Sequence, residues 1–151
     1  MRFVTIDEAL AIHDRMLAVG GGRSGIHDFF LLHSAIERPK AQFGGKYLYL
    51  SLWQAAAALL QSLVKNHPFV DGNKRTAYFS AVRCLRKNGY LLEPRTEGEI
   101  VRFMVKVDTA NMTLKQIVEK GQQLEAKVLL RAVKLYLSKR LDVYWGTVKQ
   151  I

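Results

Sequence analysis

The chain has few residues that could cross-link it or anchor it in a membrane. Its 151 residues include one cysteine, Cys84, so no disulfide can form within the chain, which suits a reducing cytoplasm. The longest apolar run, Ala55 to Leu60, is far too short to cross a bilayer. The first residues lack the basic and then apolar segments of a secretory signal. We therefore expect a cytoplasmic protein that does not enter the membrane.

Acidic residues are also scarce. Only 13 aspartates and glutamates face 23 lysines and arginines, which gives a net charge of +10. This excess favours an anionic partner, namely a nucleotide, a nucleic acid, an acidic protein or an anionic membrane surface, and does not choose among them. The basic residues are scattered and no helix-turn-helix pattern is present, which argues against direct binding of nucleic acid.

Apolar residues recur at helical spacing over most of the chain, whereas strand patterns are few. Helix starts are marked by polar capping residues: Thr5 with Glu8, Asp28, Thr96 with Glu99, and Thr113. The two most apolar helices are expected from Ser51 to the His67-Pro68 pair and over 73–87, where Asn88-Gly89 ends the second. The predicted fold class is all-α, with this central buried pair holding a polar loop between its members.

Glycines interrupt the helical pattern at two places. The run 20–22 lacks any phosphate-binding glycine motif and is interpreted as the end of the first helix and a hinge. The segment 40–49 holds two glycines and three aromatic residues without helical spacing. There we expect a short β-hairpin or flap that turns at the paired glycines.

The most informative segment is the loop between the central helices, His67-Pro68-Phe69-Val70-Asp71-Gly72-Asn73-Lys74-Arg75. The first N–H groups of a helix have no partner within it, and the helix dipole places positive charge there, so phosphate is favoured. Gly72 allows a sharp turn and a close approach of the ligand to the backbone. Lys74 and Arg75 add full positive charges.

Two further residues of this loop carry chemistry. The carboxylate of Asp71 would repel phosphate unless a cation came between them, which suits a Mg²⁺ ligand. Histidine accepts protons near neutral pH, so His67 is a candidate base for a hydroxyl that attacks phosphorus. Each residue also has a structural explanation: a helix end at His67, an N-cap at Asn73 and a solvated face at Lys74. Taken together, they favour a phosphate-handling site.

This nine-residue loop resembles the signature of the Fic/Doc family. The resemblance extends to Gly22–Asp28 and to the segment 85–90, and covers roughly residues 1–121. Within the family the chain is similar to the Doc (death-on-curing) branch, the toxin half of bacterial toxin–antitoxin pairs. It implies a catalytic helical bundle with a hairpin flap over 1–121. The basic segment 122–151 remains an extension of unknown role, expected to be mostly helical.

Two positions depart from the adenylylating members of the family. Those members usually carry glycine in place of Lys74 and a second arginine in place of Tyr78. Glycine leaves room for the diphosphate of a nucleotide, whereas lysine fills that space with a side chain and a charge. The resemblance therefore implies that ATP binds reversed, with its γ-phosphate toward the attacking hydroxyl. It implies phosphorylation with Mg²⁺, and adenylylation stays the alternative.

The resemblance also implies a role for each site residue. His67 is the implied general base, Asp71 the Mg²⁺ ligand and Phe69 the buried anchor of the loop. The implied phosphate-binding residues are Gly72, Asn73, Lys74 and Arg75, and those of the target-positioning flap are Phe43, Gly44, Gly45, Lys46 and Tyr47.

The implied substrate is a Ser or Thr hydroxyl of a translation protein, with elongation factor Tu the known target in the Doc branch. A small antitoxin is the implied partner. A third alternative is a non-catalytic basic binding module, whose binding would depend steeply on salt. The intact motif argues against an inactive relative.

Overall fold

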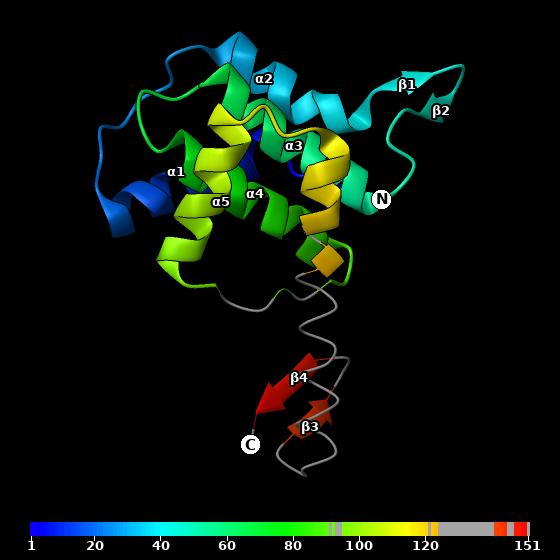
Figure 1. Ribbon diagram of the computed structural model, residues 1–151. Helices are drawn as coiled ribbons and strands as arrows, with labels where there is room; N and C mark the ends of the chain where they lie inside the picture. The colour runs from blue at the N-terminus through cyan, green and yellow to red at the C-terminus, as the bar shows by residue number, and fades with distance from the viewer. Residues whose placement is uncertain (91, 93–94, 121, 124–140, 145–146, 151) are drawn as a thin grey trace.

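The computed structural model describes residues 1–90, 92, 95–120, 122–123, 141–144 and 147–150. The elements, in chain order, are α1 (Ile6–Gly20), α2 (Phe29–Glu37), the 3-10 turn η1 (Arg38–Lys40), β1 (Gln42–Phe43), β2 (Lys46–Tyr47), α3 (Leu52–Asn66), α4 (Asn73–Lys87), α5 (Glu97–Thr109), β3 (Leu141–Tyr144) and β4 (Thr147–Gln150). Residues 114–120 are also helical. The predicted all-α fold with a short hairpin is confirmed (Figure 1).

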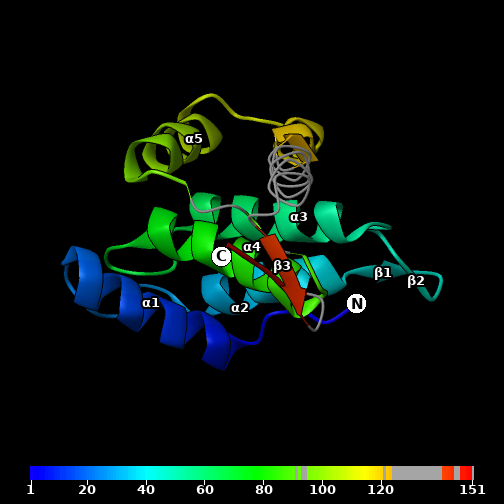
Figure 2. The ribbon, with the colours of Figure 1, turned by 90° about the horizontal axis from the view of Figure 1, so that it is seen from below.

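The helices form three layers, and the middle layer is the pair α3 and α4. Figure 2 shows α3 and α4 in the middle, α1 and α2 on one side, and α5 with the helix at 114–120 on the other. Because α3 lies between layers, it is buried on nearly every face, and its alanine run 55–58 lets its neighbours approach closely. No helix in the described part of the chain is long and apolar enough to span a membrane.

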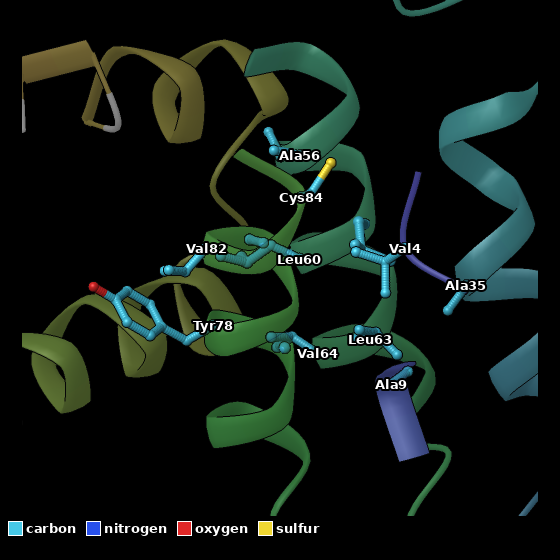
Figure 3. Packing of buried hydrophobic residues seen from close by; sticks show 14 of the residues in the cluster. Val4, Ala9, Ala35, Ala56, Leu60, Leu63, Val64, Tyr78, Val82 and Cys84 are labelled. Carbon is cyan, nitrogen blue, oxygen red and sulfur yellow. The ribbon is translucent and has the colours of Figure 1, made fainter. Parts of the chain in front are cut away.

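Aliphatic side chains of α3 and α4 form the centre of the core. Figure 3 shows Leu60 of α3 beside Val82 of α4, while Leu63 of α3 points toward Ala9 of α1. Cys84 lies in the same cluster, where burial raises the pKa of its thiol to about 11. The thiol therefore stays protonated at neutral pH and behaves as a small core residue, not as a nucleophile.

Capping residues start α1, α2 and α5 as the sequence predicts, and the capping box of α3, at Ser51 and Gln54, was not predicted. Complete capping boxes start α1, α3 and α5, and Asp28 accepts a hydrogen bond from the Leu31 N–H at the start of α2. At the end of α4, the N–H of Tyr90 donates to the Leu85 carbonyl and the N–H of Gly89 to the Arg86 carbonyl. This pair of bonds is a Schellman motif around a glycine with φ of 91°.

The described end of the C-terminal extension was not anticipated. Strands β3 and β4 pair antiparallel, with Leu141 opposite Gln150 and Tyr144 opposite Thr147. Most of the helix expected from Gln122 onward lies outside the described residues. The division of the chain into a catalytic part at 1–121 and an extension at 122–151 therefore stays a prediction.

Candidate active site

Two left-handed residues shape the loop between α3 and α4. His67 ends α3 with φ 47° and ψ 53°, and Gly72 precedes α4 with φ 74° and ψ 12°. Glycine adopts this conformation freely, as expected of Gly72, whereas histidine does so at a cost of about 1–2 kcal/mol. Strained backbone is typical of functional sites, and here it occurs at the candidate base. The His67 side chain is half exposed and can meet a ligand.

Phe69 and Asn73 lock the middle of the loop. Phe69 is only 2% exposed, as expected of an anchor, and stacks on His13 with ring centroids 3.8 Å apart. The Asn73 side chain accepts from the Phe69 N–H at 2.9 Å and donates to the Phe69 carbonyl at 2.8 Å. Asn73 is the first residue of α4 and Gly72 is the N-cap. The amide of Asn73 is thus committed to the loop, and its backbone N–H, the first of α4, is the group that it can offer to an anion.

His13 supports the loop from α1. It is 3% exposed, and its Nδ1 lies 3.2 Å from the hydroxyl of the buried Thr76. Burial lowers the pKa of His13, with the positive charge of Arg75 acting in the same direction. A neutral ring therefore packs beneath Phe69, and a Cβ at Gly72 would lie 3.5 Å from it. No part in the site was predicted for His13 from the sequence.

The glycine run 20–22, at the end of α1, lies on one side of the site. Arg75 donates from Nη1 to the Met16 carbonyl at 3.0 Å and from Nη2 to the Gly21 carbonyl at 2.7 Å. A Cβ at Gly22 would lie 2.8 Å from Oδ2 of Asp71. The run therefore does more than end a helix, because it lets the motif's arginine and aspartate approach the main chain of α1.

Asp71 is held as an ionised carboxylate. The Gly72 N–H donates to its Oδ1 at 2.7 Å and the Arg23 N–H to its Oδ2 at 3.3 Å. These two hydrogen bonds, with the charges of Arg75 and Arg23, lower the pKa of Asp71. A partly exposed, ionised carboxylate beside a helix N-terminus fits a Mg²⁺ ion, which takes one or two carboxylates together with phosphate oxygens.

On the other side of the site lies α5, which contributes Asp108, a residue that the sequence analysis did not identify. Asp108 Oδ2 lies 2.8 Å from Lys74 Nζ, and Oδ1 lies 3.8 Å from Nε2 of His67. The hydrogen bond from Lys74 lowers the pKa of Asp108 against the opposing effect of burial, so it too is ionised. One signal was present in the sequence: an acidic residue in the last turn of a predicted helix, where the dipole disfavours a carboxylate.

The hairpin forms where it was predicted but lies away from the motif. Gln42 pairs with Tyr47 and Phe43 with Lys46, and the turn glycines Gly44 and Gly45 have positive φ values of 57° and 76°. The segment just before α2 contacts the motif loop through the Ile26–Phe69 bridge, and the hairpin follows the other end of α2. Figure 1 shows the hairpin projecting from the bundle near the start of α3.

A helix of 15 residues such as α3 is about 22 Å long, and His67 directly follows its end. The structure therefore groups His67, Asp71, Lys74 and Arg75 but does not bring the hairpin next to them. Phe43, next to the turn glycines, is 83% exposed, so its side chain is accessible to a partner.

Comparisons with known proteins agree with this site. The family model described as the Fic/DOC family matches residues 3–85, more than half of the chain, so the chain belongs to the Fic/Doc family. The match runs from before α1 into α4 and includes the whole motif, while Asp108 lies outside it.

Two relatives carry the Doc name. The chain is 50% identical over 72 residues to "Toxin Doc" of Mycolicibacterium smegmatis, covering 48% of this chain and 55% of that protein. It is 34% identical over 89 residues to "Protein kinase doc" of Escherichia phage P1, covering 59% of this chain and 70% of that one. The match thus spans about half the length of the first relative. The predicted resemblance to the Doc branch is confirmed.

Proposed function

We propose that this chain is a Doc-like toxin. It transfers the γ-phosphoryl group of ATP to a Ser or Thr hydroxyl of a translation protein, with elongation factor Tu as first candidate, in the cytoplasm. The observation that carries the proposal is the convergence of His67, an ionised Asp71 and two cations at the N-terminus of α4. A relative named "Protein kinase doc" supports phosphoryl transfer over other phosphate chemistry.

The chemistry follows from these positions. The acceptor hydroxyl attacks the γ-phosphorus while Nε2 of His67 takes its proton, and the bond to the bridging oxygen breaks to release ADP. Lys74 and the first N–H groups of α4 stabilise the charge on the phosphoryl oxygens. Arg75 keeps its remaining N–H donors for the nucleotide while it holds the α1 main chain. Asp71 would hold Mg²⁺, which supplies further charge neutralisation when it is bound.

Labelled ATP tests the reaction. Wild-type protein is incubated with elongation factor Tu and ATP carrying label at the γ- or at the α-phosphate. We expect label from the γ-position only, and none with His67→Ala. His33→Ala is the matched control, because His33 is an exposed histidine on α2. Label from the α-position would establish adenylylation instead. Equal γ-label with His67→Ala would refute the role of the base.

A small antitoxin is the proposed regulatory partner. Large apolar side chains are exposed where α2 begins beside the motif loop: Phe29 at 50%, Phe30 at 85%, and Ile26 and Val70 at 42% each. An apolar surface at that place suits the apolar face of a partner helix. We expect Phe30→Asp to weaken capture of a co-expressed antitoxin while γ-label transfer stays intact. Unchanged capture would exclude this surface.

A further inference from the structure

One carboxylate lies between the proposed base and the proposed phosphate-binding lysine. Asp108 forms an ion pair with the ammonium group of Lys74 at 2.8 Å, and its other carboxylate oxygen lies 3.8 Å from Nε2 of His67. The second distance is too long for a hydrogen bond. A negative charge beside a site for phosphate opposes ligand binding, so its presence there calls for a function. The inference that follows rests on the function proposed above.

The fold fixes this carboxylate in place. Its neighbours on α5, Val107 and Met104, are 0% and 1% exposed, so the helix is anchored in the core. Lys65, near the end of α3, donates to the Asp108 carbonyl and, at 2.9 Å, to Oδ1 of Asn111. The Asp108 side chain is 23% exposed. α5 therefore presents the carboxylate on a rigid support toward the loop that follows α3.

Without this contact, Lys74 would be a flexible chain with a point charge that meets phosphate from many directions. The ion pair restricts it to the side of the α4 N-terminus that faces His67. The transferred phosphoryl group must be on that side, because the hydroxyl that attacks it gives its proton to His67. The titratable and charged groups around Asp108 are Lys74 from α4, His67 from the loop and Lys65 from α3.

We propose that Asp108 is a positioning residue, which holds Lys74 toward the reacting phosphoryl group and weakens anion binding in return. Its removal has two opposite effects. An anion binds more tightly because a nearby negative charge is gone, and turnover slows because Lys74 is no longer aimed. Damage to the structure alone would weaken both binding and turnover.

Binding of inorganic triphosphate and of ATP, measured by calorimetry, tests the first effect independently of catalysis. We expect Asp108→Asn to bind triphosphate about fivefold more tightly. This factor corresponds to the repulsion between two unit negative charges a few ångströms apart in water, which the substitution removes. The kcat for γ-phosphoryl transfer falls about tenfold or more. Glu97→Gln is the matched control, because it removes an exposed charge at the other end of α5, and it leaves both quantities unchanged.

Two more variants separate positioning from folding. Asp108→Glu keeps the charge and moves the carboxylate by one methylene, so affinity stays within about twofold while kcat falls. This variant carries the test if Asp108→Asn does not fold. In a Lys74→Met background, Asp108→Asn is expected to change kcat no further, because the lysine through which it acts is absent.

The outcomes also separate this inference from the proposed function. Weaker triphosphate binding by Asp108→Asn, or an equal loss of kcat in the Lys74→Met background, overturns the positioning role alone. If Asp108→Asn binds triphosphate more tightly but the wild-type protein transfers no phosphoryl group to any acceptor, both the proposed reaction and the positioning role in it are overturned. A wild-type protein that does not bind triphosphate overturns both as well.

Discussion

Gly20 is the last residue of α1, and we predict that a glycine is needed there because it leaves space for the side chain of Arg75, not because the helix ends there. A Cβ at this position would overlap Nη1 of Arg75. The obstacle is the end of a flexible side chain, so Gly20→Ala would displace the guanidinium instead of distorting the backbone. Arg75 would then lose its bonds to the carbonyls of Met16 and Gly21, which are 3.0 and 2.7 Å long.

The size of the effect follows from two opposing contributions. One of the two bonds from Arg75 is partly buried and the other is exposed, so together they contribute about 2 kcal/mol. Alanine in a helix stabilises by about 0.5–1 kcal/mol relative to glycine. The net loss is about 1–1.5 kcal/mol, and Tm falls by about 3–5 °C in a chain of this size.

The assay compares two helical glycines. Gly98 lies in the first turn of α5, where a Cβ would find its nearest neighbour, Nη1 of Arg102, at an ordinary 3.6 Å. Gly98→Ala should therefore raise Tm by about 2 °C, from helix propensity alone. Gly20→Ala should lower it and also weaken triphosphate binding. A Tm for Gly20→Ala equal to or above that of the wild type would refute the reasoning.

Three further predictions concern residues that hold the site. Glu8→Gln should lower the free energy of unfolding by about 2 kcal/mol at pH 7, as measured by urea unfolding. The reason is that hydrogen bonds, from Lys87 above all, outweigh the effect of burial and lower the pKa of Glu8 to about 2. The loss of stability in the variant should therefore fade as the pH falls from about 5 toward 2. Burial lowers the pKa of His13 below its ordinary 6.5, so wild-type stability should fall as pH drops below that value, and His13→Gln should flatten this dependence. Asn73→Ala should remove two bonds to Phe69, lower stability by about 2 kcal/mol and abolish most γ-label transfer.

Each of these variants has a matched control. Asp7→Asn alters the exposed neighbour of Glu8 in the same helical turn, and it should show a smaller loss without the same pH dependence. His33→Gln, on the exposed face of α2, should not change the fall in the free energy of unfolding that the wild type shows at acidic pH. Asn66→Ala removes one exposed bond to the Leu31 carbonyl and should lower stability by less than about 1 kcal/mol. Equal effects in control and test variants would contradict the assigned contacts.

Local signals in the sequence were sufficient to predict most of the fold. The bounds of α4 agree with those predicted, because a glycine N-cap and an Asn-Gly stop are encoded within a few residues of each end. The hairpin of β3 and β4 was missed although its signal is also local. Alternating Leu141 and Val143, then a Trp-Gly pair and Thr147 to Gln150, form a strand–turn–strand pattern. Helix-prone residues before it led to the expectation of a mostly helical extension.

The surroundings of the motif were not predictable in the same way, because they depend on contacts between residues far apart in the chain. Lys74 appeared in the sequence as a free cation that distinguishes two reactions. In the folded chain it is paired with Asp108, which lies outside the segment that defines the family. The motif specifies the loop, but the direction in which its lysine points depends on α5. Relatives that share the motif and differ at the position of Asp108 should therefore differ in phosphate affinity and in turnover, even where all nine motif residues are the same.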